Sequence, residues 1–278
     1  MSDLRAPERQ ALRRQMRDFY RRAATYKQQL QTHTEAYQSS YVALVERFVP
    51  RGGLLLELGS GLGIAARMLS ERGYRVVGID VSPLFLKEAA AWRSERLDYL
   101  VGDGLELPFV DEAFDAVVSH QYLEHVPDVE LALNEMGRVL RPGGRVVLVG
   151  PNLLSPLVPL MEWRNTRRGR VRRAVWARHL GGALVQARDN WRLLRQKRKT
   201  DRPQFSYRRP ELDEEVSGGD ADSVYLANPT DLGHYFRGRG WRILARGAGV
   251  SWRGRLLAVL APELSPYLCF VAERPAGG

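Results

Sequence analysis

Short apolar runs alternate with helical patterns from Leu54 to Gly150, and this alternation limits the possible folds more than any other feature of the chain. Five runs rich in Leu, Val and Ile stand at 54–58, 74–80, 97–101, 114–119 and 145–150. Helical periodicity fills the stretches 63–72, 83–96 and 129–140 between them. Buried strands that alternate with helices are typical of a parallel sheet covered on both faces. The sequence therefore predicts a doubly wound α/β fold.

The segments that flank this core suggest a division of the chain into four parts. Residues 1–50 form an N-terminal helical cap, in which apolar side chains follow one another at intervals of four and three residues from Leu12 to Tyr26. Residues 51–152 are the ligand-binding core, and 153–226 are a basic helical lid or insert that breaks the alternation. Residues 227–278 complete the core, with a helix expected at 229–239 and closing strands at 241–246 and 267–274.

Composition excludes several classes of protein. A chain of 278 residues with 44% hydrophobic and 27% charged residues is typical of a globular protein. The first ten residues carry two Arg and two acids, which disfavours a signal peptide, and prolines interrupt the longest uncharged stretch at 146–161, which disfavours a membrane span. Cys269 is the only cysteine, so internal disulfides are excluded and a reducing, cytoplasmic compartment is expected.

The net charge of +10 is concentrated in one segment. Residues 151–210 hold 16 Lys and Arg against three acids, a net of +13, so the remainder of the chain has a net of −3. Moreover, 38 of the 42 basic residues are Arg, a bias that genomic base composition can produce without any functional cause. Charge alone therefore disfavours nucleic acid as the partner.

The first chemical motif is the glycine-rich turn at 57–63, which stands directly between an apolar strand and a helix. Glycine allows the sharp turn and leaves space for a ligand, while the N-terminus of the next helix favours an anionic group. A tight turn without a ligand is the alternative. A dinucleotide fingerprint would place its third Gly at 64, where Ile64 stands, so this spacing disfavours NAD.

Two further polar motifs follow the next two strands. Asp80 ends the second strand and is placed to accept from both hydroxyls of a ribose, although it could instead cap the helix that begins near Pro83. Asp103 and Gly104 follow the third strand, where they could recognise a purine ring or form an ordinary turn. Because the carboxyl ends of parallel strands share one edge of the sheet, the three motifs together predict a crevice for a nucleoside-bearing ligand.

These motifs, in their order and spacing, resemble those of class I S-adenosylmethionine-dependent methyltransferases, and in particular the type 11 group that includes ubiquinone-biosynthesis and natural-product enzymes. The segments that carry the resemblance are ELGSGLG (57–63), GIDVSP (78–83), GDGLELPF (102–109), FDAVVSHQYLEHVPD (114–128) and EMGRVLRPGGRVVLVGPN (135–152). The resemblance covers about residues 50–152 and the closing helix and strands from Asn228. It implies a Rossmann-like, mostly parallel seven-stranded sheet whose last strand is antiparallel.

The resemblance also implies S-adenosyl-L-methionine as the cofactor and a set of residues that bind it. Asp80 would hold the ribose, Val81 would flank the adenine, and Asp103 and Gly104 would recognise it. The methionine part and the sulfonium end would be lined by Glu57, Gly59, Ser60, Gly61, Ser119 and His120.

His125 is the candidate catalytic residue, with His120 second. A neutral imidazole can remove a proton near pH 7, which is required only when the methyl acceptor is a protonated group such as a hydroxyl. In some relatives a matching His is paired with an acidic residue just after the fifth strand. This chain has Pro151 and Asn152 there, so His125 is expected to lack that carboxylate, and it could simply begin a helix beside Glu124.

The insert is expected to decide what the protein acts on, since function is added to a fold by its variable parts. Between 171 and 199, apolar residues including Leu184 and Trp191 form one helical stripe opposite a row of Arg and Lys, and Gly181-Gly182 could divide the helix. The stripe could pack on the protein's own domain as a lid. Alternatively, residues 153–200 could rest on an anionic membrane at the inner face, with a hydrophobic or lipid-like acceptor.

The sequence thus predicts a methyltransferase that acts on a small-molecule acceptor by in-line displacement, without a metal. A non-catalytic nucleoside-binding or partner protein on the same fold is the alternative, and an NAD-dependent enzyme ranks third.

Overall fold

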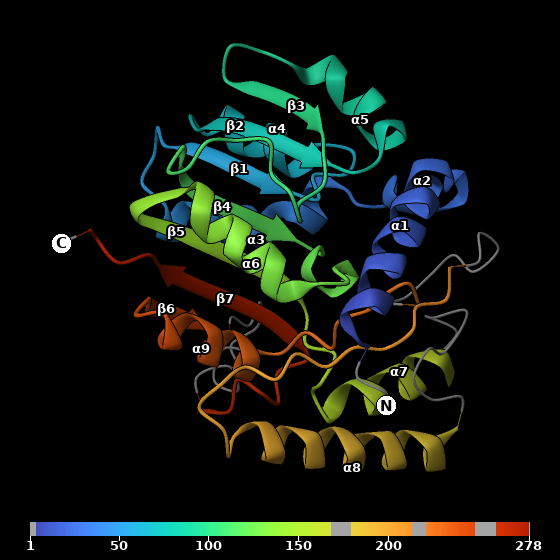
Figure 1. The fold of residues 1–278 in the computed structure, drawn as a ribbon. Coiled ribbons are helices and arrows are strands. Elements are labelled where there is room, and N and C mark those ends of the chain that lie inside the picture. The colour runs from blue at the N-terminus through green and yellow to red at the C-terminus, as the bar shows by residue number, and fades with distance from the viewer. Residues whose placement is uncertain (1–3, 168–178, 213–220, 248–259, 278) are drawn as a thin grey trace.

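A seven-stranded sheet forms the centre of the molecule in the computed structural model, which describes residues 4–167, 179–212, 221–247 and 260–277 (Figure 1). The strand order is β3-β2-β1-β4-β5-β7-β6. The strands are β1 (Leu54–Leu58), β2 (Arg75–Asp80), β3 (Leu97–Val101), β4 (Phe114–His120), β5 (Leu140–Pro151), β6 (Arg242–Arg246) and β7 (Tyr267–Glu273).

The pairing of the strands confirms the predicted fold class. Strands β1 to β5 pair in parallel, while β7 runs antiparallel to both β5 and β6. The chain leaves β1 for β2 and β3 on one side and returns to β4 on the other side. Open α/β sheets bind ligands at such a reversal of strand order, outside the carboxyl ends of the strands. The topology therefore places a crevice at the ends of β1 and β4.

Helices cover both faces of the sheet (Figure 1). One buried cluster joins the sheet to α3 (Glu35–Phe48) and α4 (Ile64–Glu71), and a second joins the other face to α6 (Val129–Val139) and α9 (Pro229–Gly238). Helix α5 (Pro83–Ala89) contributes to both clusters, and the short 3-10 turn η1 (Ala90–Trp92) extends it. The apolar strands predicted from the sequence are thus buried on both sides, as a doubly wound sheet requires.

The N-terminal segment forms three helices, α1 (Ala6–Arg22), α2 (Ala24–Leu30) and α3. Helix α1 lies across the carboxyl edge of the sheet, with Leu12, Met16 and Tyr20 as its buried residues (Figure 1). These three residues are spaced four apart, so the periodic pattern in the sequence marks the face of α1 that packs inward.

The insert contains α7 (Leu157–Arg167) and α8 (Leu180–Lys197), and the sequence stripe on α8 is not the face that packs. The buried residues of α8 are Ala183, Asn190, Leu194 and Lys197, whereas Leu184 and Trp191 are exposed. The expectation that the stripe packs on its own domain is therefore wrong for Leu184 and Trp191 and holds for Leu194, and Lys197, which the sequence placed among the basic residues opposite the stripe, is buried. Gly181-Gly182 stand in the first turn of α8 and do not divide it; the predicted helical stretch at 171–178 lies outside the described residues.

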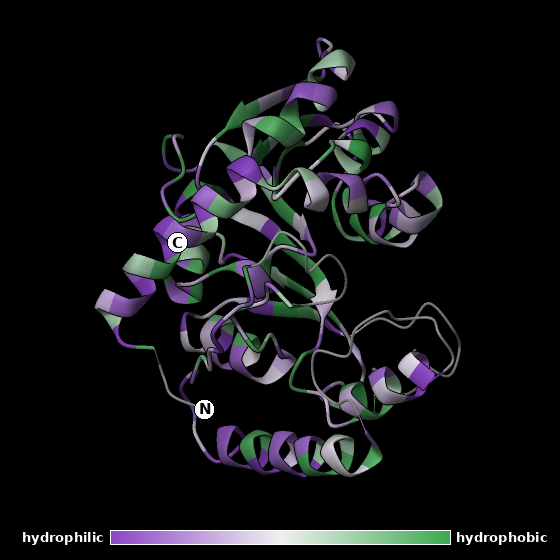
Figure 2. Ribbon diagram, turned by 90° about the vertical axis from the view of Figure 1, so that its right-hand side faces the viewer, coloured by the Kyte–Doolittle hydropathy of each residue, from purple (hydrophilic) through white to green (hydrophobic). Residues whose placement is uncertain are grey.

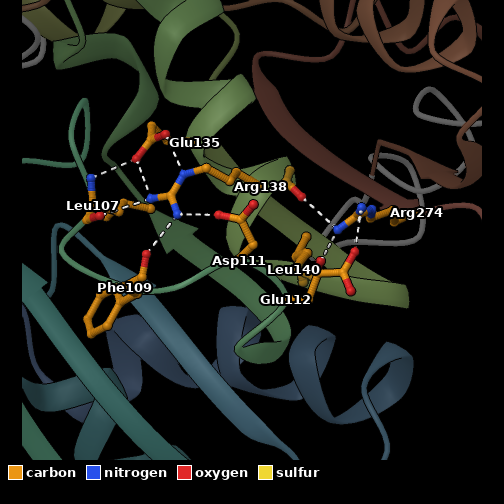
Figure 3. A network of polar contacts seen from close by, with 9 residues as sticks. Leu107, Phe109, Asp111, Glu112, Glu135, Arg138, Leu140 and Arg274 are labelled. Carbon is orange, nitrogen blue, oxygen red and sulfur yellow. Dashed lines mark hydrogen bonds and ion pairs between the residues drawn. The ribbon is translucent and has the colours of Figure 1, made fainter.

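One polar network fixes the loop between β3 and β4 (Figure 3). The Arg138 guanidinium on α6 donates to the carbonyls of Leu107 and Phe109 at 2.9 and 2.7 Å, and it forms a two-bond contact with Glu135. Glu135 in turn accepts from the Leu107 amide at 2.8 Å, and Asp111 accepts from Arg138 at 2.8 Å. Beside this network, Arg274 joins β7's end to Glu112 (Figure 3). The loop that begins with Asp103 and Gly104 is therefore held on α6.

Candidate active site

The glycine-rich turn after β1 is held by the carboxylate at the end of β2. Gly59, Gly61 and Gly63 all have positive φ, at +67°, +53° and +76°, so this turn uses a backbone conformation that favours glycine. Asp80 accepts from the Gly61 amide at 3.0 Å and from the Ser82 amide at 2.9 Å. Two of the motifs found in the sequence are thus in direct contact.

The position of the Tyr122 ring gives a second reason why glycine is required at Gly59 and Gly104. A Cβ at Gly59 would lie 2.8 Å from the Tyr122 ring, and a Cβ at Gly104 would lie 2.1 Å from its hydroxyl. The ring, which follows β4, therefore bridges the turn after β1 and the loop after β3. Sequence reasoning attributed Gly59 to the close approach of a ligand and Gly104 to recognition of a purine or to an ordinary turn, and it missed the tyrosine that occupies the space beside both.

Burial raises the pKa of two carboxyl groups at the centre of the sheet edge. Desolvation raises the pKa of Asp80 to about 6, although the amides of Ser82 and Gly61 oppose the shift. Desolvation also raises the pKa of Glu57 to about 8, against the effect of the Tyr41 hydroxyl and the Ala66 amide. Carboxyl groups with raised pKa values in a crevice are typical of functional sites, where a bound ligand replaces the missing water.

Asp103 is engaged by the N-terminal cap. One carboxylate oxygen accepts from Arg13 Nε of α1 at 2.7 Å, and the other accepts from the Leu105 amide at 2.9 Å. Arg13 also lies 3.4 Å from Glu106. An ion pair thus joins α1 to the loop after β3, at the position where the sequence predicted recognition of an adenine.

These residues surround a cavity of about 170 Å³. Its lining combines the sheet edge with α1, α2 and the start of α3. The predicted residues that line it are Gly59, Ser60, Gly61, Asp80, Val81, Asp103, Gly104, His120 and His125, and Tyr20 of the predicted cap lines it too. Arg13, Phe85 and Tyr122, which the sequence did not single out, complete this part of the lining. Glu57 and Ser119 are buried behind the lining, at 3% and 1% exposure.

His120 lines the cavity at the end of β4, where its ring is fixed by a hydrogen bond and by stacking on an aromatic neighbour. Its Nδ1 lies 2.7 Å from Gln38 Oε1, and its ring stacks on Tyr41 with 5.0 Å between ring centroids. Burial lowers the pKa of His120 to about 4, with a further contribution from His33. A neutral, stacked ring with its Nδ1 engaged suits a lining role, in agreement with the preference for His125 as the base.

His125 has a carboxylate partner, and the expectation that it would lack one is wrong. It ends the 3-10 turn η2 (Leu123–His125), and its Nδ1 lies 3.2 Å from Asp222 Oδ2. Tyr20 of α1 donates its hydroxyl to the same Asp222 oxygen at 2.6 Å. On the other side, Nε2 lies 3.8 Å from Glu124. Burial acts to raise the pKa of Asp222, but the His125 imidazole and the Tyr20 hydroxyl more than compensate and lower it.

The insert brings Asp222 to this position through its backbone. Residues 206–211 and 221–226 pair with each other, with bonds from Arg208 N to the Val224 carbonyl and from Leu226 N to the Ser206 carbonyl. The amides of Val224 and Tyr225 then donate to the carbonyl of Glu124, at 2.7 and 3.0 Å. The insert is thus bound to the same turn that carries His125. This pairing between distant segments left no pattern in the sequence.

Asn152, which follows β5 where some relatives have an acidic residue paired with the matching His, contacts other groups in this protein. Its side-chain amide donates to the carbonyls of Glu263 and Ser265, at 3.0 and 2.7 Å, and the residue is fully buried. It therefore holds the segment before β7 in place. Cys269 is buried in β7, where burial raises the pKa of its thiol to about 12 and so disfavours the reactive thiolate.

No group of three or more His, Cys, Asp or Glu residues within the described ranges is arranged to hold a metal ion.

A parallel sheet with an antiparallel last strand, a glycine-rich turn after β1 and a carboxylate ending β2 defines the class of nucleoside-binding α/β domains. Residues 56–148 match the family model of a methyltransferase domain, of the type 11 group. The core of the chain is thus similar to the methyltransferase domains of this family, in agreement with the resemblance of the motifs at 57–152.

Similar proteins share the core and differ elsewhere. The demethylmenaquinone methyltransferase of Thermobifida fusca is 35% identical over 133 residues, which are 46% of this chain and 56% of the relative. The chain thus spans only about half the length of the curated relatives that it matches.

Solved structures resemble the chain over a longer stretch but at lower identity. The Burkholderia thailandensis 1,6-didemethyltoxoflavin-N1-methyltransferase, solved with S-adenosylhomocysteine, has a TM-score of 0.58 and 16% identity, covering 99% of this chain and 93% of that one. The cyclase SpnF has a TM-score of 0.53 and 20% identity, covering 87% of this chain and 83% of that one. These likenesses concern the fold.

The crevice fits the cofactor that the family implies. The buried Oγ atom of Ser60 and Oε2 atom of Glu57 have no hydrogen-bond partner among the described residues. Asp80 has a raised pKa that hydroxyl donors of a ligand would lower further, in addition to the backbone amides that it already accepts from. A ligand that carries hydroxyl groups and an amino group matches this set of acceptors.

Proposed function

We propose that the protein transfers a methyl group from S-adenosylmethionine to a small-molecule acceptor. The observation that supports this most directly is the convergence on one cavity of the turn after β1, Asp80, the loop of Asp103 and Gly104, and His125. The methyltransferase names of its curated relatives support the same reaction.

Different residues of the crevice bind different parts of the cofactor. Asp80 accepts from the ribose hydroxyls, Asp103 accepts from the adenine amino group, and Val81 flanks the ring. Gly59, Ser60 and Gly61 frame the methionine part, and His120 lines the end nearest β4. When bound, S-adenosylmethionine supplies a methyl group on a sulfonium whose departure leaves a neutral thioether, so alignment of the acceptor provides much of the acceleration.

His125 acts as the general base. Asp222 holds a proton on Nδ1, which leaves Nε2 as the atom that takes a proton from the acceptor. Tyr20 donates to Asp222 and orients that carboxylate. Asp222 is therefore a positioning residue, supplied by the insert, and His125 is the residue that contacts the acceptor.

The acceptor is an apolar molecule that bears a hydroxyl group on an aromatic or quinol-like ring. Apolar side chains such as Met16, Leu30 and Val126 make up much of the cavity lining, and a base is required only for a protonated nucleophile. The curated relatives are named for demethylmenaquinone, a quinone whose reduced, quinol form bears ring hydroxyl groups. A hydrophobic acceptor of this class is thus consistent with both the lining and the relatives.

A protein that binds the nucleoside without transferring a methyl group is the second candidate. The cyclase SpnF, which has the same fold, is named for a different reaction, so the fold alone does not define the chemistry. The buried contact of His125 with Asp222 favours catalysis, because a binding protein has no need for an oriented imidazole in the ligand cavity.

Calorimetric titration with S-adenosylmethionine, S-adenosylhomocysteine and NAD tests the cofactor. We expect the first two to bind and NAD not to bind. Asp80→Ala should weaken binding by about ten- to a hundredfold, because hydrogen bonds to a charged group contribute about 1.5–3 kcal/mol. Binding of NAD alone, or equal affinity in Asp80→Ala, would contradict the proposal.

Methyl transfer is then measured with labelled S-adenosylmethionine and a short-chain demethylmenaquinol as the probe acceptor. Product in the wild type and a loss of at least about tenfold in His125→Ala, at unchanged cofactor affinity, support transfer with His125 as the base. Cofactor binding without transfer to this probe or to other hydroxylated aromatic compounds would favour the binding protein.

A further inference from the structure

Helix α8 has an inner face whose polar and charged groups are satisfied within the protein. Lys197 Nζ lies 2.8 Å from Asp231 Oδ2 in an ion pair that is fully buried on both sides. Asn190 donates to the Ser155 carbonyl at 3.2 Å, and Leu194 packs in a small cluster with Leu153. The orientation of α8 is therefore fixed, because rotating the helix would leave a buried charge without its partner.

The opposite face of α8 exposes large apolar side chains. Leu180, Leu184 and Trp191 are 44%, 54% and 42% exposed, and Val185 is 49% exposed. At 100° per residue, Leu180, Leu184 and Trp191 fall within one narrow stripe. Helix α8 forms the outermost layer at one end of the molecule, and green apolar residues alternate with purple polar ones along it (Figures 1 and 2). A row of exposed apolar residues on a fixed helix indicates an interaction surface.

Basic residues border this stripe. Arg188, Arg192 and Arg195 follow Leu184 at helical spacing and lie between the stripe and Val185 around the helix. Asp189 is the only acid in α8, and Arg188 and Arg192 lie 3.1 and 3.8 Å from it. The exposed face of α8 is thus apolar and positive, within a segment, 151–210, that carries a net charge of +13. We call this face, from Leu180 to Arg195, the outer face of α8.

We propose that the outer face of α8 docks on an anionic lipid surface. An amphipathic helix with Leu and Trp beside Arg lies in the plane of a membrane interface, where the apolar side chains enter the acyl boundary and the guanidinium groups contact the headgroups. Among anionic partners, a nucleic acid would use the arginines but would leave Leu180 and Leu184 in water. The combination of apolar and basic residues therefore favours lipid.

This partner extends the proposed function, since a lipid-like acceptor would be available at the same surface, but the docking itself does not depend on methyl transfer. No helix in the described ranges is long and apolar enough to cross a membrane. The contact is accordingly one of surface adsorption through α8, and it is expected to weaken as salt screens the headgroup charge.

Vesicle sedimentation of the full chain tests the docking surface. The probes are vesicles of phosphatidylglycerol mixed with phosphatidylcholine, and vesicles of phosphatidylcholine alone. We compare the wild type with the triple variant Arg188→Gln/Arg192→Gln/Arg195→Gln and with Leu184→Gln/Trp191→Gln. The matched control is Arg51→Gln/Arg75→Gln/Arg96→Gln, which removes three exposed arginines at the amino ends of β1, β2 and β3, at the other end of the sheet (Figure 1).

We expect the wild type to bind the anionic vesicles and to remain in solution with the neutral ones. The triple variant on α8 should bind about a hundredfold more weakly, because each of the three basic residues contributes about 1 kcal/mol near the surface, which is about a fivefold effect. The Leu184/Trp191 variant should also lose several-fold, whereas the control triple variant should stay within about twofold. Glutamine keeps the helical propensity of α8, so all variants should fold.

Equal recovery with both kinds of vesicle, or an equal loss in the control variant, would overturn the proposal. So would binding that depends on the arginines but not on Leu184 and Trp191, with RNA as an effective competitor, since this result would indicate a nucleic-acid surface. Titration with S-adenosylhomocysteine on the same variants separates this proposal from the proposed function. A wild type that binds vesicles but not this ligand would refute only the methyltransferase function.

Discussion

Asp80 is the residue whose ionisation should control cofactor affinity. Its pKa is raised to about 6 by burial, and only the ionised carboxylate can accept from two ribose hydroxyls. Because the folded-state pKa lies above the ordinary value, the carboxyl stabilises the free protein fully at low pH and loses that contribution as pH rises through about 6. A ligand that donates to Asp80 compensates for the charge that burial disfavours.

We therefore expect the affinity for S-adenosylhomocysteine to be constant above about pH 6 and to fall with decreasing pH, by up to about tenfold per unit. Calorimetric titrations between pH 5 and pH 8 measure this. Asp80→Asn, which has no charge to lose, should bind weakly at every pH. A wild-type affinity that does not change across this range would show that Asp80 does not hold the ligand.

Asp222 permits a sharper test of the base. Asp222→Asn keeps the size of the side chain but removes the charge that stabilises a proton on His125. Turnover of a hydroxylated acceptor at neutral pH should fall by about a hundredfold, while the affinity for S-adenosylhomocysteine stays unchanged. The loss should diminish as pH rises past the pKa of the acceptor hydroxyl, because an acceptor that is already ionised needs no base. Rate profiles of wild type and variant that coincide from pH 6 to pH 9 would exclude this role.

A comparison of the predicted site residues with those in the structure shows what the local sequence can predict. Gly59, Asp80 and Asp103 were found because each stands at a fixed place relative to a strand, and the strand alone determines where its carboxyl end points. Asp222 and Tyr122 were missed because each acts through a contact made by tertiary folding, and for Tyr20 of the predicted cap the same reason hid its bond to Asp222. Asp222 is separated from His125 by a long insert whose docking on the Glu124 carbonyl leaves no periodic signal.

At the scale of elements, the loop after β3 depends on α6. Arg138 binds two loop carbonyls, Asp111 and both oxygens of Glu135, and these hydrogen bonds raise its pKa above the ordinary value (Figure 3). An ammonium group cannot reproduce this planar arrangement of donors. The loop carries Asp103 and Gly104 at its start, so the network should affect both stability and cofactor binding.

We expect Arg138→Lys to lower the free energy of unfolding by about 1–3 kcal/mol and to weaken binding of S-adenosylhomocysteine several-fold. Urea denaturation and calorimetry measure the two effects. Arg93→Lys is the control, because its pair with Asp98 is exposed and should contribute less than about 1 kcal/mol. Equal effects in both variants would mean that the network does not hold the loop.

The elements themselves differ in how far the sequence could define them. Strands β1 to β5 and helices α4 to α6 were predicted because alternation between buried strands and amphipathic helices reflects one sheet with two covered faces. The helical periodicity of α8 was also recognised in the sequence, but the face of the helix that packs on the protein was not. Its inner face is fixed by the Lys197–Asp231 pair and by Asn190, and polar residues that are buried through specific partners cannot be distinguished from solvated ones by hydropathy.

At the scale of the whole molecule, the cavity is enclosed by parts of the chain that lie far apart in sequence. Helix α1 contributes Arg13 to Asp103 and Tyr20 to Asp222, so it joins the core to the insert. Both contacts join segments that are far apart in sequence, and a helix at the edge of a sheet opens more readily than its central strands. A ligand in the cavity contacts the core and α1 together, which links its binding to the closure of the cap.

S-adenosylhomocysteine should therefore slow amide hydrogen exchange in α1 and around Asp222 by at least about tenfold, in addition to its effect on the turn after β1. The amides of β4 and β5, at the centre of the sheet, are expected to exchange through global unfolding, so they should slow only by the factor that ligand binding adds to the global stability. Arg13→Ala should reduce the protection of α1 while leaving that of the glycine-rich turn, since it removes the bond from the cap to the crevice without altering the sheet edge. Protection confined to residues 57–61 and 78–82 would show that the cap closes independently of the cofactor, and that access to the cavity is controlled elsewhere in the molecule.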